Sequence, residues 1–182
     1  MFFLLLFTAV SFAGDLDGQW RQHCARGYFR EESFLGDSAV YTEHNFRDQG
    51  CLAPSVDTVS RGALVSGGVV PQPTGARELD FVLESVSLVP RDERAALVYE
   101  KISLCGLSGW KAGEAKEITG LLCDLFGQGA PLPVPSTGAR KFGIVRVEED
   151  ALYFGQLSPG RDGSSELRRP LVLDPSPYRR VH

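Results

Sequence analysis

The sequence of 182 residues has no run of like charges, no low-complexity block and no internal repeat. Its net charge is −4, and acidic and basic residues are mixed along the whole chain. Proteins that bind nucleic acid or an anionic membrane surface usually carry a basic patch or tract, so this distribution argues against both partners. Because no linker divides the chain, we expect one domain, residues 14–182.

The sequence also lacks recognisable catalytic motifs and metal-ligand clusters. Its three histidines are scattered, no two cysteines form a CxxC pair, and the cysteine spacings match no structural zinc site. There is no GxSxG elbow, HExxH helix or phosphate-binding glycine loop. His44 has polar neighbours in an expected strand, which is more typical of a surface residue than of a general base. We therefore expect no enzyme activity, no cofactor and no metal ion.

The N-terminal segment MFFLLLFTAVSFA is apolar and contains no charged side chain. Small residues at Ser11 and Ala13 predict a secretory signal peptide, residues 1–13, that is cleaved before Gly14. The apolar run is shorter than the roughly 20 residues of a membrane-spanning helix, so we expect no membrane span in the mature chain. The alternative is a buried N-terminal strand. The expected location is secreted or periplasmic.

The four cysteines, Cys24, Cys51, Cys105 and Cys123, allow three pairings. In an oxidising compartment, the pairing that joins segments closest in sequence is Cys24–Cys51 with Cys105–Cys123. Each closed loop stabilises the fold by roughly 3 kcal/mol in the chain-entropy estimate. The alternative is a set of free buried thiols in a cytosolic protein.

Most of the chain has the composition of β-strands. Segments rich in Val, Tyr, Phe, Thr and Leu, with Gly, Pro, Asp and Asn at their boundaries, are 38–48, 55–68, 77–89, 94–105, 141–149 and 151–157. Their regular spacing and short turns predict an all-β fold, an antiparallel barrel or sandwich. The apolar side changes within 77–89, which predicts a bulge near Ser85.

Residues 111–126 are ambiguous. Their apolar residues recur at helical spacing, which favours a short helix. Gly113 and Gly120 each disfavour a helix by about 1 kcal/mol relative to alanine. A short helix and a disulfide-tied extended loop therefore both fit.

The segment GDLDGQWRQHC, residues 14–24, places Gly18 two residues before Trp20. The glycine lets another chain segment or side chain approach the strand closely. This pattern resembles the first strand of calycins, in which the tryptophan closes one end of a barrel and a late arginine lies across its ring. The resemblance implies that Arg168 or Arg169 takes this position. Neighbouring residues of a strand face opposite sides, so only one of the two can do so.

The segments GQWRQHC and DQGCLAP resemble the first part of the lipocalin-like domain of the adenomatosis-polyposis-coli-down-regulated family. Downstream, LCGLSGW and LYFGQLSPGRDGSSELRRPLVLDPSPY are similar to small exported bacterial proteins with the same plan. The resemblance covers most of the mature chain, although 60–100 matches only as strands. It implies a calycin-type, lipocalin-like antiparallel β-barrel with a disulfide near the N-terminus and an apolar or lipid-like ligand in the barrel mouth. The Wnt-signalling role of longer, membrane-anchored relatives is not expected here.

Two functions fit these sequence features best. The first is an exported, monomeric barrel that binds a small apolar ligand, with a lining that includes the aromatic residues Phe34, Tyr41, Phe81 and Phe154. The second is an exported protein–protein interaction module, such as an inhibitor or envelope partner, whose barrel is filled by its own side chains. The phenylalanines suit both, and a hollow or packed interior distinguishes them. A third, a secreted enzyme with an unrecognised site, requires a cleft with convergent polar groups.

Overall fold

The structure is a computed structural model and describes residues 13–125, 127 and 129–182. The predicted signal peptide, 1–13, lies outside the described residues except for Ala13. The elements are α1 (Ala13–Leu16), β1 (Gly18–Arg21), β2 (Tyr28–Leu35), β3 (Ser38–Phe46), β4 (Pro54–Val69), β5 (Arg77–Pro90), α2 (Glu93–Lys101), η1 (Leu104–Gly106), β6 (Lys116–Glu117), β7 (Leu122–Cys123), β8 (Leu132–Pro133), β9 (Arg140–Lys141), β10 (Ile144–Glu148), β11 (Ala151–Phe154), η2 (Glu166–Arg168) and β12 (Tyr178–Arg180). No helix of the described part is long and apolar enough to cross a membrane.

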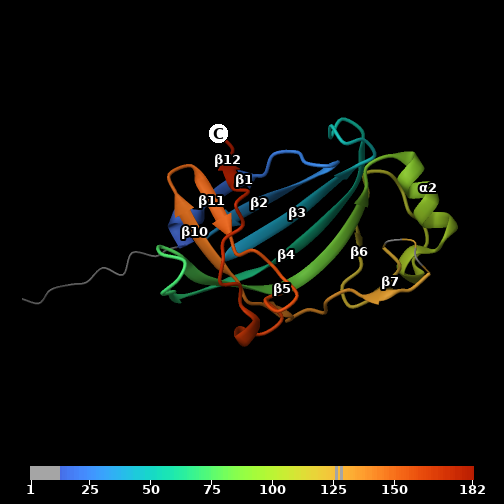
Figure 1. Cartoon of the computed structure of the whole chain (residues 1–182). Helices are drawn as coiled ribbons and strands as arrows, with labels where there is room; N and C mark the ends of the chain where they lie inside the picture. Colours follow the sequence, from blue (N-terminus) through green and yellow to red (C-terminus); the bar gives the residue numbers. More distant parts are fainter. Residues whose placement is uncertain (1–12, 126, 128) are drawn as a thin grey trace, which may run out of the picture.

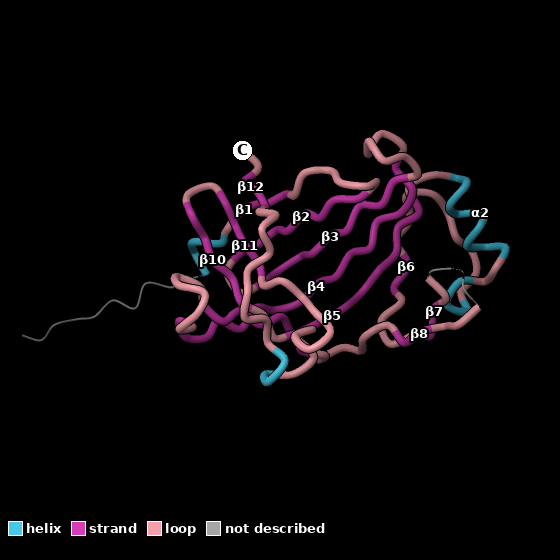
Figure 2. The backbone as a smooth tube through the Cα atoms, viewed as in Figure 1, coloured by secondary structure: helices cyan, strands magenta, loops and turns pink. Residues whose placement is uncertain are grey.

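Eight antiparallel strands close into a barrel. Strands β1 to β5 pair in chain order, β5 pairs with β10, and β10, β11 and β12 lead back to β1 (Figure 1). Beyond its short pairing with β10, the long strand β5 pairs with β9 and then with β6. Figure 2 shows the continuous run from β2 to β5, with α2, β7 and β8 beyond one end of it. The prediction of an all-β antiparallel barrel is confirmed.

One end of the barrel is closed by a core of buried side chains. Its members are Leu16, Trp20, Phe34, Ala39, Leu64, Leu79, Val145, Leu152 and Tyr178. Trp20 is fully buried, and its indole Nε1 donates a hydrogen bond to the carbonyl oxygen of Leu16 at 2.7 Å. The prediction that Trp20 fills the closed end is therefore confirmed, and α1 supplies the acceptor that a buried indole N–H requires.

The arginine over the Trp20 ring is Arg180, whose Cζ lies 4.2 Å from the ring centroid. The prediction of Arg168 or Arg169 at this position is wrong. The β1–β12 ladder sets Arg180 directly opposite Trp20, whereas residues 168 and 169 follow β11 in a segment outside the ladder. A Cβ atom on Gly18, where φ is +118°, would lie 2.9 Å from the Arg180 Nη1 atom. Glycine at this position is therefore what lets the guanidinium approach the ring.

The two arginines of the wrong prediction have other partners. Arg169 is buried and forms an ion pair with the buried Asp80 of β5. Arg140 pairs with the same carboxylate at 2.8 Å but stays half-exposed. Arg168 is exposed and pairs with Asp162 at 2.8 Å. The Arg169–Asp80 contact fastens the C-terminal segment to the barrel wall.

A bulge bends β5 where the sequence predicts one. The β4–β5 ladder passes from Ser85 directly to Leu83, which leaves one β5 residue without a partner on β4. At the same place, a Cβ atom on Gly62 would lie 2.2 Å from the Val82 carbonyl oxygen and 2.7 Å from the Phe81 ring. Only glycine fits there, and the close approach places the Phe81 ring against the inner surface of β4.

A second core lies under α2, at the far end of β5. Its buried members are Leu83, Val86, Leu88, Leu104, Trp110, Ile118, Cys123 and Val134. The prediction of a strand at 94–105 is wrong, because α2 occupies most of it. The Asp92 carboxylate accepts a hydrogen bond from the Ala95 N–H at 2.8 Å and so caps a helix rich in good helix formers.

Of the segment 111–126, the described residues 111–125 form an irregular loop that contains the short strands β6 and β7. Gly113 and Gly120 both have positive φ, +77° and +71°, which ends any helix. The disulfide Cys105–Cys123 ties this loop to η1. Of the two alternatives left open by the sequence, the disulfide-tied loop is correct.

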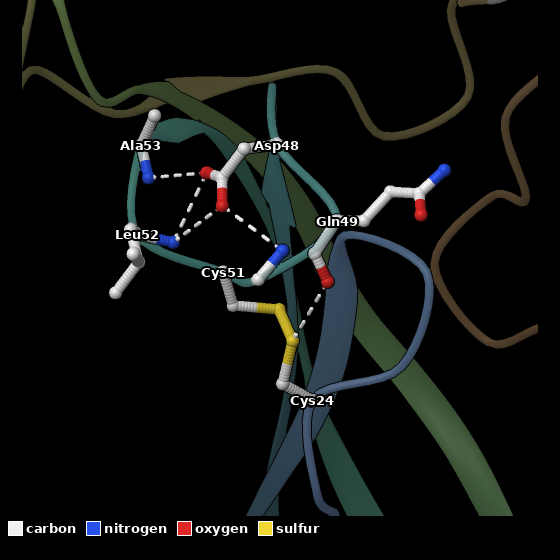
Figure 3. The surroundings of a disulfide bond; sticks show 7 residues. Cys24, Asp48, Gln49, Cys51, Leu52 and Ala53 are labelled. Atoms are coloured by element: carbon white, nitrogen blue, oxygen red, sulfur yellow. Dashed lines mark hydrogen bonds between the residues drawn. A yellow bond between two sulfur atoms is a disulfide. The ribbon is translucent and has the colours of Figure 1, made fainter.

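The first predicted disulfide is present as well. Cys24, after β1, is bonded to Cys51, in the turn between β3 and β4 (Figure 3). The Asp48 carboxylate holds this turn by accepting hydrogen bonds from the backbone N–H groups of Ala53, Leu52 and Gly50. These bonds lower the pKa of Asp48, the one from Ala53 most strongly. Both predicted cysteine pairings are confirmed.

Candidate ligand-binding cavity

A cavity of about 1090 Å³ lies inside the barrel and opens to solvent. It lies between the closed-end core and the second core, because its lining includes members of both. Its apolar lining comes from β5, from the irregular loop, from the residue after β8 and from β10 and β11, and includes Leu79, Phe81, Leu83, Val86, Ile118, Val134, Ile144 and Phe154. The barrel is therefore hollow beyond its closed end.

Three of the four predicted aromatic residues line this cavity. Tyr41, Phe81 and Phe154 pack against the closed-end core on one side and face the cavity on the other, so they form its floor. The Tyr41 ring lies 4.6 Å from the Phe81 ring centroid, nearly perpendicular to it. The prediction of Phe34 is wrong, because it is 2% exposed within the closed-end core, beneath Tyr41.

A buried carboxyl group, that of Glu32, also lines the cavity. The side chain is 3% exposed, and its Oε2 atom has no hydrogen-bond partner among the described residues. The Tyr178 hydroxyl donates a hydrogen bond to this carboxyl. Burial raises the pKa of Glu32 well above its usual range, and neither this hydrogen bond nor the positive charge of Arg30 offsets that effect. Burial therefore favours the neutral, protonated form of this carboxyl group at the cavity floor.

Two tyrosine hydroxyls share this environment. Burial is the main cause of the raised pKa of Tyr178, and Glu32 adds to it. Burial, followed by the charge of Glu32, likewise raises the pKa of Tyr41. Both phenols therefore stay protonated at neutral pH and are hydrogen-bond donors in an otherwise aromatic floor.

Charged and apolar side chains line the cavity between its aromatic floor and its opening to solvent. Arg30 pairs with Glu43 at 3.0 Å, and both line the wall. Lys141 also lines it, and its pKa is lowered mainly by burial and further by the charge of Arg30. The leucines Leu125, Leu132 and Leu157 line the cavity although their side chains are exposed, so they mark its rim.

Sequence reasoning missed Glu32. The segment FREESF reads as a solvent-facing strand because three of its residues are charged. Alternation does carry a signal, because residue 32 lies on the same side of β2 as Phe34. If Phe34 is assigned to the interior, Glu32 must follow it there, whatever its charge.

The pH dependence of stability tests this placement of Glu32. The folded protein binds the Glu32 proton more tightly than the unfolded chain does, because its pKa is raised from an ordinary value of 4.5. Wild-type stability should therefore be fully present below about pH 4.5 and fall as pH rises, by at most about 1.4 kcal/mol per pH unit from this group. Glu32→Gln has no such proton. The free energy of unfolding of this variant minus that of wild type, measured by urea unfolding, should therefore increase with pH. Parallel pH profiles would contradict a buried Glu32.

The remaining polar cluster that resembles a catalytic arrangement lies outside the cavity. His44 Nδ1 lies 3.0 Å from an Asp57 carboxylate oxygen, and Arg91 lies 3.3 Å from the other oxygen. Since the neighbouring Glu43 and Thr58 line the cavity, alternation directs His44 and Asp57 to the outer face of the barrel. Within the described residues, no group of three His, Cys, Asp or Glu side chains is placed to hold a metal ion.

A scan against models of protein families finds no match to this chain, and a search of curated proteins finds no significant match either. The structure bears out the coarser part of the family resemblance, a closed antiparallel barrel compatible with a lipocalin-like fold.

Proposed function

We propose that this protein is an exported, disulfide-stabilised β-barrel that binds a small, largely apolar molecule in its cavity. The observation that carries the proposal is the hollow interior of about 1090 Å³ behind an aromatic floor. Small-molecule sites typically have volumes of roughly 300–1,000 Å³ and mostly apolar linings with few polar groups. The alternative, an interaction module with a packed barrel, is disfavoured by the same cavity.

The proposal includes export and excludes catalysis. Disulfides persist in oxidising compartments and are rare in the cytosol, so the two disulfides support the assignment made from the apolar leader. The described lining of the cavity contains no histidine, and its one cysteine, Cys123, is disulfide-bonded. These residues suit binding better than nucleophilic chemistry.

We also propose a relationship to the lipocalin-like domain of the adenomatosis-polyposis-coli-down-regulated family. Three features support it: the closed barrel, the buried Trp20 with an arginine over its ring, and the disulfide Cys24–Cys51. Binding of an apolar ligand agrees with what that resemblance implies.

A neutral fluorescent probe tests the proposed function. N-phenyl-1-naphthylamine should bind the wild-type protein with a Kd in the micromolar range. Ser60→Trp should weaken this binding at least about tenfold, because Ser60 lines the cavity and an indole would fill part of it. Arg61→Trp is the matched control, since the neighbouring Arg61 is exposed on the outer face and should leave binding unchanged.

The same two tryptophan variants show which result would contradict the proposed binding site. Circular dichroism and thermal unfolding would establish that both are folded. If the probe fails to bind wild type, or if a folded Ser60→Trp variant binds it as tightly as Arg61→Trp does, the cavity is not a binding site.

A further inference from the structure

The cavity floor contains a buried carboxyl group, that of Glu32, whose hydrogen-bonding capacity is only partly satisfied by the described residues. Glu32 is 3% exposed, lines the cavity and has one carboxyl oxygen, Oε2, without a partner among the described residues. The Tyr178 hydroxyl donates a hydrogen bond to the same carboxyl group and lowers its pKa, but burial outweighs this effect. A buried polar atom without a partner destabilises a protein, so native structures rarely retain one unless something else binds it. The position of Glu32 in the cavity wall makes a bound ligand the natural partner.

The surroundings of Glu32 disfavour a charged ligand group at this depth. An ammonium group would require an ionised Glu32, which burial opposes, and would lie in a cavity that Arg30, Arg140 and Lys141 also line. A carboxylate would have to be buried beside the Glu32 carboxyl group and three aromatic rings, which is strongly disfavoured. Two of the cations in the lining, Arg30 and Arg140, are already paired with Glu43 and Asp80. A neutral polar group avoids both penalties.

A hydroxyl group satisfies the hydrogen-bonding needs of Glu32 in either protonation arrangement. It donates one hydrogen bond and accepts others, so it fits Oε2 whether or not that oxygen carries the proton. The rest of such a ligand would extend from the floor past Phe81 and Leu83 toward the exposed leucines of the rim. This wall is apolar and suits an unbranched aliphatic chain.

We propose that the ligand enters with a neutral hydroxyl group first, that Glu32 binds this hydroxyl at the cavity floor, and that the ligand class is therefore aliphatic alcohols. This inference rests on the proposed function, because it specifies which apolar molecules the cavity selects. Tyr178 acts with Glu32 by donating its own hydrogen bond to the same carboxyl group.

Competition against N-phenyl-1-naphthylamine tests the assignment with four ligands of equal chain length: 1-octanol, 1-chlorooctane, octanoate and octylammonium. The variants are Glu32→Met, which removes the polar group, and Glu32→Gln, which retains a neutral hydrogen-bonding group of similar shape. In Glu32→Met, 1-octanol should bind about tenfold more weakly than in wild type, the effect of losing one buried hydrogen bond. Binding of 1-chlorooctane should be unchanged or tighter. Glu32→Gln should bind 1-octanol within about threefold of wild type.

The contrary outcomes separate this inference from the proposed function. If the probe binds and Glu32→Met loses no affinity for 1-octanol, the hydroxyl assignment is wrong and the apolar cavity stands. If octylammonium binds wild type more tightly than 1-octanol and is lost in Glu32→Gln, Glu32 is an ionised anchor for amines and the proposal is overturned. If neither the probe nor any of the four ligands binds, both proposals fail.

Discussion

Replacing Trp20 with alanine should lower the free energy of unfolding by about 3–5 kcal/mol, the usual effect of removing a large, fully buried aromatic side chain. Trp20 is 0% exposed at the centre of the closed-end core. Its removal leaves a cavity there and leaves the Leu16 carbonyl oxygen without its hydrogen-bond donor. Urea unfolding followed by circular dichroism measures the change, with the m-value showing whether the transition keeps its two-state character.

Arg180→Met is the matched control for this prediction. The guanidinium of Arg180 lies over the Trp20 ring and donates a hydrogen bond to the Asp17 carbonyl oxygen at 2.6 Å. Methionine keeps most of the packing over the ring and loses the cation–π contact, so the expected cost is about 0.5–2 kcal/mol. A Trp20→Ala variant that loses less than Arg180→Met would show that the closed end is not built around this indole.

Replacing Asp80 with alanine should cost about as much, roughly 3–5 kcal/mol, because the buried Arg169 guanidinium then keeps only the more distant and more exposed Glu78 carboxylate, at 3.5 Å. Asp80 and Arg169 are 3% and 7% exposed, and Arg169 also donates a hydrogen bond to the Gly143 carbonyl oxygen at 2.6 Å. The contact joins β5 to a segment 89 residues later in the chain. Its loss should therefore detach the C-terminal segment from the barrel wall as well as expose a charge.

A double-mutant cycle separates the pair from its surroundings. Asp80→Leu combined with Arg169→Met should lose clearly less stability than the sum of the two single replacements, because the contact that the two residues share is then lost only once. Arg140→Ala is the control, since Arg140 contacts the same carboxylate but is half-exposed and should contribute less than about 1 kcal/mol. Additive losses in the cycle would contradict a coupled, buried ion pair.

The barrel can be predicted from the sequence because its strands carry local signals. β-branched and aromatic residues alternate between turn residues, and the resemblance of the Gly18–Trp20 pattern to the first strand of calycins places Trp20 at a closed end. The cysteine pairing follows from the short loops that it closes. These features depend on neighbours close in sequence, which is why they are predictable.

The errors arise where distant contacts decide the outcome. Arg180 lies over Trp20 in place of Arg168 or Arg169 because the β1–β12 register, set by pairing across the whole chain, selects the arginine that reaches the ring. Composition predicts a strand where α2 lies, because the Val and Leu residues of this segment outweigh the signal of the Asp92 cap. Phe34 and Glu32 lie at different depths on one side of β2, and depth in a barrel cannot be derived from alternation alone.

The most direct test of the proposed binding site is the location of a bound alcohol in a crystal of the protein, using 8-bromo-1-octanol and the anomalous scattering of its bromine atom. We expect one bromine peak inside the cavity near the rim leucines Leu125, Leu132 and Leu157, with the hydroxyl end in density at Glu32. A bromine peak outside the barrel, for example on the exposed side chains of Leu97 and Val98 in α2, with the cavity filled only by ordered water, would contradict this site.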